Sequence, residues 1–278
     1  MKIAITADGT CDISKKYAEE HNITLTQIAV IMGDKEYIEG INIVPQDIYN
    51  FVEKNKVLPK TSAKSSYEYK EVFERLRKDY DAVIHFAISF GVSSSGNNAL
   101  QASKELDNVY VVDTKSLSSG SGLLVMSCVD KIKKGLPLEK ILKEIKEEIE
   151  KVQASFLINK LDYLKKGGRC SAIALFGANL LGIKIRVELV DGMMQPAKKY
   201  VGKFPVCLSK YLQDIVKEYP PELNRVFVTG SSAMPSIREN LIKEVKALGF
   251  KEIIDMQAGS TICSHCGPET IGVLYMKK

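Results

Sequence analysis

The segment STICSHCGPETIG near the C-terminal end gathers residue types that could do chemistry, because Cys263 and Cys266 flank His265 and Gly267-Pro268 follow them. A structural zinc site needs four ligands, and no second Cys/His pair stands at the usual spacing. A redox Cys-x-x-C opens a helix, whereas Gly-Pro ends or turns a chain. The spacing therefore disfavours a metal clip and a redox dithiol, and leaves open a functional histidine or a plain turn.

A second polar segment, SFGVSSSGNN, includes Ser93 and resembles a nucleophile elbow, although it is one residue too long for Gly-x-Ser-x-Gly. Ser93 and His265 with Asp8 or Asp113 would make a hydrolase triad. The simpler interpretation is a serine-rich loop that caps the next helix. A Ser/His hydrolase acting on an acyl ester stays open as the alternative function.

The elements that must position these groups alternate between short apolar runs and helical patterns in residues 1–153. Strands are expected at 2–6, 24–31, 81–89 and 108–113, and helices from residues 13, 45, 66, 96, 118 and 137. This alternation predicts an α/β domain with a mainly parallel sheet covered by helices. The loops ADGTCD, SFGVSSSGNN and DTKSLSSGSG leave the carboxyl ends of its strands, where ligands bind.

Residues 154–278 predict a second α/β domain, with a mixed sheet and helices. The expected strands are 154–158, 225–230, 252–257 and 271–276, with a hairpin over 182–201 that turns at Asp191-Gly192. The expected helices are a short one ending at KKGGR, an apolar one at 171–181, and two starting at residues 209 and 235. Two such domains imply a cleft between them.

Composition narrows the class of protein. The 278 residues are 45% hydrophobic and 26% charged, with 39 basic and 34 acidic side chains dispersed along the chain, so we expect a globular protein with no nucleic-acid partner. The N-terminal apolar run is too short for a signal peptide and no run is long enough for a membrane span, so we expect a cytoplasmic protein whose six cysteines are free thiols.

The three polar loops supply uncharged hydrogen-bond donors, which suit a single anionic oxygen group better than a metal or a nucleotide. The apolar run at 171–181 would serve as core or as an apolar wall. The residues alone suggest an amphiphile with an acidic head group.

Taken in order, the motifs resemble the DegV family of bacterial proteins that bind long-chain fatty acids. ADGTCDIS is similar to its Asp-Ser-x-x-Asp element, with Gly9 at the serine, and PKTSAKSS to its Pro-x-Thr-Ser element, matched by Thr61 and Ser62. Ser93 matches a serine of the family's Ser-Gly-Thr element. The segments VVDTKSLSSGSG, LDYLKKGGRCS and HCGPETIG match its Asp-x-Lys, Gly-Gly-Arg and His-x-Gly-Pro elements.

The resemblance runs the whole chain and implies a carrier that is no enzyme, with one acyl chain buried between the domains. It implies a carboxylate held by Thr61, Ser93 and His265, with Ser62 and Arg169 as further ligand-binding residues. Palmitate, stearate or oleate would be the ligand, and the resemblance implies no cofactor and no metal.

Some family members deliver their fatty acid to an ATP-dependent fatty acid kinase, without catalysing the phosphorylation, through a basic segment that contains arginine. Here PAKKYVGKFP offers Lys198, Lys199 and Lys203 instead, and lysine lacks the bidentate fork of arginine. The resemblance thus implies a kinase subunit as a possible partner, together with transient contact with a membrane surface.

Overall fold

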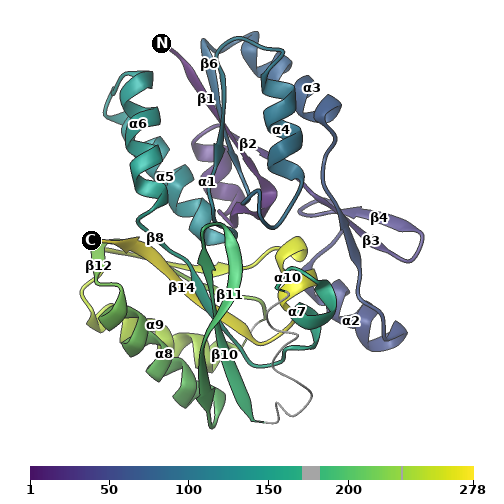
Figure 1. The fold of residues 1–278 in the computed structure, drawn as a ribbon, viewed down its shortest axis with the longest axis vertical. Coiled ribbons are helices and arrows are strands. Elements are labelled where there is room, and N and C mark those ends of the chain that lie inside the picture. Colours follow the sequence, from purple (N-terminus) through teal and green to yellow (C-terminus); the bar gives the residue numbers. More distant parts are fainter. Residues whose placement is uncertain (171–181, 233) are drawn as a thin grey trace.

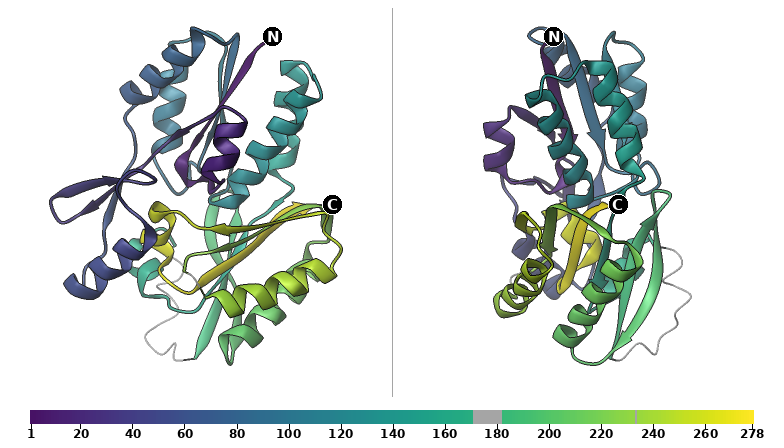
Figure 2. Two further views of the ribbon diagram at one scale, coloured as in Figure 1. Left: turned by 180° about the vertical axis from the view of Figure 1, so that it is seen from behind. Right: turned by 90° about the vertical axis from the view of Figure 1, so that its left-hand side faces the viewer.

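The computed structural model describes residues 1–170, 182–232 and 234–278. Two β-sheets lie one above the other in Figure 1, each with its own helices, and an arm made of a small sheet and a helix projects to one side. Figure 2 shows the same two halves and the same arm from behind and from the side. The expected apolar helix at 171–181 lies outside the described residues.

The first half contains a four-stranded sheet in which every pair is parallel, as predicted. Its order is β2-β1-β6-β7, with bounds Ile23–Thr26, Ile3–Asp8, Ala82–Ala87 and Val109–Asp113. The helices of this half are α1 (Lys15–Glu20), α3 (Ser66–Arg77), α4 (Ser95–Ser103), α5 (Ser119–Lys133) and α6 (Leu138–Ile149).

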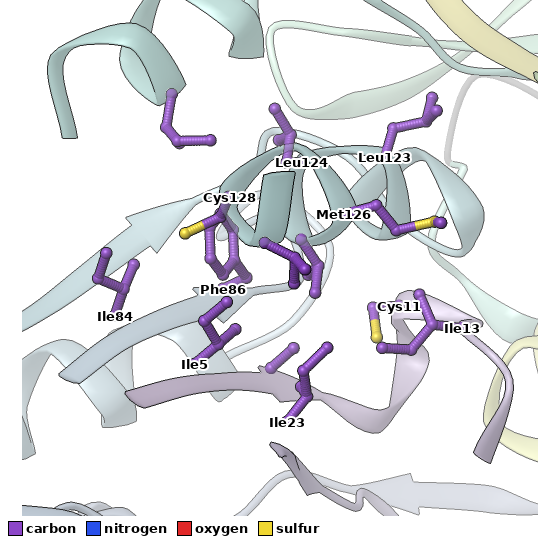
Figure 3. Close-up of a cluster of buried hydrophobic side chains, with 14 of the residues drawn as sticks. Ile5, Cys11, Ile13, Ile23, Ile84, Phe86, Leu123, Leu124, Met126 and Cys128 are labelled. Atoms are coloured by element: carbon purple, nitrogen blue, oxygen red, sulfur yellow. The ribbon is translucent and has the colours of Figure 1, made fainter. Parts of the chain in front are cut away.

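Helices cover both faces of this sheet. Because successive strand residues point to opposite sides, residues of both kinds of position are buried. On one face Ile5, Ile84 and Phe86 pack with α5 and α6, and Figure 3 shows α5 lying over these strands. On the other face Ala4 and Val83 pack with α3 and α4. The apolar runs of β1 and β6 are therefore continuous rather than alternating, as is typical of parallel strands.

The second half contains a seven-stranded mixed sheet of order β11-β10-β9-β14-β12-β13, with β8 paired to β14. Only β12 and β13 are parallel among its described pairs. The strands are β8 (Val152–Gln153), β9 (Ser155–Ile158), β10 (Ile183–Val190), β11 (Met193–Val201), β12 (Pro221–Gly230), β13 (Glu252–Gln257) and β14 (Thr270–Lys277). Helices α8 (Phe204–Glu218) and α9 (Pro235–Ala247) cover one face, and this mixed sheet confirms the expected α/β class.

The hairpin turn is confirmed at Asp191-Gly192, where both residues have positive φ (48° and 77°). Two adjacent positive φ angles are the requirement of a two-residue hairpin turn, which Asp-Gly meets readily. Helix α8 begins at Phe204 rather than at residue 209, because Pro205 occupies its first turn, where a missing N–H costs nothing.

The sheet of the arm was not expected from the sequence, whereas its helix was expected from residue 45, where α2 (Pro45–Asn55) begins. The sheet is three-stranded and antiparallel, of order β4-β3-β5 and next to α2, with bounds Lys35–Ile38, Ala29–Met32 and Lys60–Ser62. The single strand expected at 24–31 is two strands, β2 and β3, that belong to different sheets. This run contains no Gly, Pro, Asn or Asp to mark the break.

Three short helices complete the description: η1 (Gly9–Cys11), α7 (Asp162–Gly167) and α10 (Ser260–Cys266). The Cys-x-x-C stretch, for which a plain turn was one interpretation, forms most of helix α10. The chain turns after it, at Gly267. The four-stranded sheet ends at Asp113 and β8 already joins the other sheet at Val152, just before the proposed boundary at residue 153. The division at 153 stays a prediction.

Candidate functional site

A cavity of about 460 Å³ lies between the carboxyl end of the parallel sheet and one face of the mixed sheet. Its walls come from the loop after β6, the start of α5, strands β5, β9, β12 and β14, and helix α10. Much of the wall is apolar, notably Ile88, Leu117, Phe156, Leu164, Met194 and Leu274. The volume lies within the range of ligand-binding pockets.

Thr61 and His265 meet at this cavity. The Thr61 Oγ1 atom lies 3.0 Å from His265 Nε2, and both residues line the wall. Thr61 is on β5, whose short pairing with β3 fixes its direction. Because side chains alternate along a strand, the next residue, Ser62, is exposed, and it does not line the cavity.

The environment of His265 keeps its ring neutral. Burial lowers the pKa of His265 to about 4, and the nearby Arg169 lowers it further in the same direction. Its Nδ1 atom has no hydrogen-bond partner among the described residues and lies against Gly167, where a Cβ would sit 3.2 Å from it. Gly167 therefore leaves room for the histidine ring, which gives the Gly-Gly-Arg element a packing role.

Gly267 ends α10 directly after the histidine turn. Its φ of 71° with ψ of −178° belongs to a region that essentially only glycine adopts. A Cβ at this position would come within 2.6 Å of the Tyr163 ring. The sequence Gly267-Pro268 thus turns the chain immediately behind His265.

Ser93 lines the cavity from the loop after β6. Its Oγ accepts a hydrogen bond from the Ser95 backbone N–H at 3.2 Å, and its own N–H donates to the Ser89 carbonyl at 3.2 Å. Within residues 1–170, 182–232 and 234–278, no acceptor takes the hydroxyl proton of Ser93. That proton is available to a ligand.

Arg169 lines the cavity but is exposed, and its Nη1 donates to the Gly167 carbonyl at 3.0 Å. Gly168, with φ of 70°, ends α7 and brings the arginine to the cavity wall. The structure therefore gathers Thr61, Ser93, His265 and Arg169 around one cavity and leaves Ser62 outside it.

Further hydroxyl groups line the same cavity and were not singled out from the sequence: Ser118, Thr229, Ser231, Thr261 and Thr270. Thr229 and Ser231 end β12 or follow it, as the loops of the first half follow theirs. Both positions follow the rule that ligands bind beyond the carboxyl ends of strands.

The two cysteines of α10 are both buried free thiols. Cys263 Sγ donates toward the Ser231 and Ala258 carbonyls at 3.4 Å, while Cys266 lines the cavity. Burial and the neighbouring Cys266 raise the pKa of Cys263, so the thiolate form is disfavoured. No group of three or more His, Cys, Asp or Glu able to hold a metal occurs in the described part of the chain.

The hydrolase alternative needs a base that contacts the serine and a carboxylate that orients the base. Here His265 Nε2 contacts Thr61 rather than Ser93. The carboxyl of Asp8 lies 3.6 Å from the Nε2 of a different histidine, His85. The geometry of the described residues therefore does not assemble the triad considered from the sequence.

A largely apolar cavity with hydroxyls and one neutral histidine on its wall suits a ligand that has a long apolar part and a polar head group. The chain belongs to the DegV family: the model described as "Uncharacterised protein, DegV family" matches residues 2–278. A fatty acid-binding protein of Thermotoga maritima is 30% identical over 281 residues, covering 98% of this chain and 96% of that protein.

Solved structures of the family agree in fold. A fatty-acid-binding DegV family protein from Thermus thermophilus superimposes with a TM-score of 0.93 at 25% identity, and DegV of Bacillus subtilis, described as a fatty acid binding protein, with 0.88 at 28%. Both comparisons cover 100% of each chain. Among the described helices, none has the length and apolarity needed to cross a membrane.

Proposed function

We propose that this chain binds one long-chain fatty acid in the cavity, with the carboxylate held by Thr61, Ser93 and His265. The observation that carries the proposal is the contact of Thr61 with a neutral, half-buried His265 on the wall of a largely apolar cavity that Ser93 also lines. A relative from Eubacterium ventriosum, 26% identical with a TM-score of 0.82, is described as a stearic acid-binding protein. This likeness supports a long saturated acyl chain as the ligand.

The head-group contacts follow from the hydrogen-bonding capacity of each side chain. If the neutral histidine carries its proton on Nε2, it donates to Thr61 Oγ1, and the Thr61 hydroxyl proton is then free to donate to the carboxylate. Ser93 supplies a second hydroxyl proton from the loop after β6. Arg169 contributes positive charge at an exposed position without entering the buried part of the site.

The energetics favour such a ligand. Each buried methylene contributes about 0.8 kcal/mol, so some fifteen of them contribute on the order of 10 kcal/mol before the cost of association. A buried carboxylate without partners would cost several kcal/mol, which the hydroxyl donors offset. The acyl chain thus supplies affinity, and the head-group residues supply orientation and preference for an acid.

The same proposal makes the protein a carrier that keeps its ligand chemically unchanged, in the cytoplasm, and presents it to an ATP-dependent fatty acid kinase or to a membrane surface. The support for a kinase partner is the family resemblance and the exposed Arg169 beside the cavity. Lys198 forms an ion pair with Asp214 at 2.7 Å and is about half exposed.

Extraction of the purified protein with organic solvent, followed by mass spectrometry, tests the proposal. We expect about one equivalent of a long-chain fatty acid. In parallel, the affinities of a fatty acid and of the fatty alcohol of equal length are compared, because the alcohol keeps the apolar burial and lacks the charge. Absence of lipid together with equal affinity for acid and alcohol would refute the carboxylate site, and labelling by a serine-directed phosphonate would favour the hydrolase.

A further inference from the structure

The segment ADGTCD joins β1 to α1 and carries two buried carboxyl groups, Asp8 and Asp12, which are 1% and 5% exposed. Neither residue lines the cavity. Between them the chain makes the single turn of η1, and a Cβ on Gly122 of α5 would lie 2.6 Å from the Cys11 carbonyl. This close approach to α5 fixes the turn against the core of the first half.

Asp8 is tied to both ends of the loop that carries Ser93. Its Oδ2 accepts the backbone N–H of Ile88 at 3.0 Å, where the loop begins. Its Oδ1 accepts the hydroxyl of Tyr69 at 2.5 Å, and that hydroxyl lies 2.5 Å from Ser95 Oγ, where the loop ends. The Ser95 N–H in turn donates to Ser93 Oγ at 3.2 Å, so the chain of contacts reaches the proposed ligand-binding hydroxyl.

Asp12 is tied to the helix that carries His265. Its Oδ1 accepts the backbone N–H of Gly259 at 3.0 Å, at the start of α10, and its Oδ2 lies 2.5 Å from Ser118 Oγ, at the start of α5. Asp12 thus links the first half of the chain to α10 across an interval of 247 residues. Since α10 is short, the placement of its first residue determines that of His265 about one and a half turns later.

We propose that Asp8 and Asp12 are positioning residues for the fatty-acid head group, Asp8 holding Ser93 and Asp12 holding His265, with η1 setting the separation of the two groups. This inference rests on the proposed function. It assigns a role in acid preference to two residues that do not touch the ligand. The two sets of contacts are separate, because the contacts of Asp8 reach Ser93 through Tyr69 and Ser95, whereas those of Asp12 reach α10 through Gly259.

The test uses double-mutant cycles, with the ratio of fatty-acid to fatty-alcohol affinity as the readout, since loss of apolar packing affects both ligands alike. Tyr69→Phe removes the hydroxyl between Asp8 and Ser95 and keeps the ring. Asp12→Gly removes the carboxyl and accepts the φ of 44° at this position. Asp12→Asn keeps an acceptor for Gly259 and a polar partner for Ser118, and Asp81→Asn, on an exposed carboxyl that accepts the Lys2 N–H, serves as the control.

We expect Tyr69→Phe and Asp12→Gly each to lower the acid-to-alcohol ratio by about threefold to tenfold, the effect of one hydrogen bond. In the Ser93→Ala background Tyr69→Phe should have no further effect, and in the His265→Ala background Asp12→Gly should have none. Two crossed pairs combine Tyr69→Phe with His265→Ala and Asp12→Gly with Ser93→Ala. In each of them, the effects of the two substitutions on the affinity ratio should multiply to within about twofold. Asp12→Asn should restore most of the wild-type ratio.

Unchanged ratios in Tyr69→Phe and Asp12→Gly, or effects that multiply with those of Ser93→Ala and His265→Ala respectively, would overturn the inference while leaving the fatty-acid site intact. A wild-type protein with no preference for the acid would instead overturn the proposed function and this inference with it. If Asp12→Gly does not fold, Ser118→Ala removes one of the two Asp12 contacts and takes its place in the same cycle, with the same expected coupling to His265→Ala.

Discussion

Thr61 and His265 are 204 residues apart in the sequence, and their side chains meet at 3.0 Å. The contact depends on the arm, because β5 places Thr61 and α10 packs against α2, β3 and β5 of the same arm. Half of the proposed head-group site is therefore built by a small sheet that stands apart from the two main sheets. The other half, Ser93, belongs to a loop of the parallel sheet.

Replacing Ser93 with alanine should weaken fatty-acid binding tenfold to a hundredfold. The change removes a hydroxyl donor and leaves a carboxylate oxygen without a partner, which costs about 1 to 3 kcal/mol. Displacement of a fluorescent fatty acid measures the effect. Ser62→Ala is the matched control, since Ser62 is exposed on the strand that carries Thr61, and equal losses in both variants would contradict the assignment of Ser93.

His265 should make the lipid-free protein less stable in acid. The pKa of His265 is about 4 in the folded chain against an ordinary 6.5, so the unfolded chain binds the proton first as the pH falls. The stabilisation is fully present above about pH 6.5 and is lost towards pH 4, by about 3 kcal/mol at most.

Urea unfolding of wild type and His265→Gln at pH 7, 5.5 and 4 measures this effect. The free energy of unfolding of the variant should fall less over this interval than that of wild type. Parallel curves would show that His265 is not held neutral by its surroundings.

Asp12 should have the opposite pH dependence. Burial and the neighbouring Glu39 raise the pKa of Asp12 from 3.8 to about 8, so the folded chain keeps a proton that the unfolded chain releases. This contribution to stability is complete below about pH 4 and is lost as the pH rises to 8, at about 1.4 kcal/mol for each pKa unit. Asparagine at position 12 does not ionise, so the stability of Asp12→Asn should fall less than that of wild type between pH 5 and pH 8. Calorimetric scans measure both, and an equal fall would disprove the raised pKa of Asp12.

Gly267→Ala should be strongly destabilising. Alanine is strained at this φ and ψ, and its Cβ would overlap the Tyr163 ring, so the expected loss exceeds 2 kcal/mol in thermal unfolding. Gly135→Ala is the control, because Gly135 has the same φ of 71° with nothing within 4 Å of the added Cβ, and it should lose only about 1 kcal/mol. Similar losses at both sites would exclude a special role for the turn behind His265.

The Cys263→Ser/Cys266→Ser protein should keep its bound lipid and most of its stability. A serine hydroxyl at 263 can donate to the same Ser231 and Ala258 carbonyls as the thiol does. Elemental analysis of the wild-type protein should find no zinc. One equivalent of zinc in the wild type, lost from the variant, would reverse this interpretation of α10.

The sequence was sufficient for those features that depend on local pattern. Pro137, Asp191-Gly192 and the continuous apolar runs of β1 and β6 determine nearby elements, and these were predicted close to their observed places. The sheet of the arm was missed because β3 and β5 pair across about thirty residues, and the segments KEYI and KTS are too short to favour a strand strongly.

The candidate site was predicted in part, and for a related reason. Ser93 could be placed from the rule that loops at the carboxyl ends of parallel strands bind ligands. His265 was a candidate from its own segment, but Thr61 and its pairing with His265 came only from the family resemblance, because their contact depends on the unforeseen sheet of the arm and on the unforeseen helix α10. Ser62 was included with Thr61 as a neighbour in the motif, and strand alternation turns it away from the cavity.

Strand β11 lies at the edge of the seven-stranded sheet in the described chain, where an open row of backbone groups could pair with another molecule. Pro196 interrupts that row, the pairing register shifts between Arg186 and Val187, and Lys198 carries charge along the strand. Proline, irregular register and lysine are the features by which natural sheets resist aggregation through their edges. A basic residue on this edge strand is thus explained by protection against aggregation, without a partner protein.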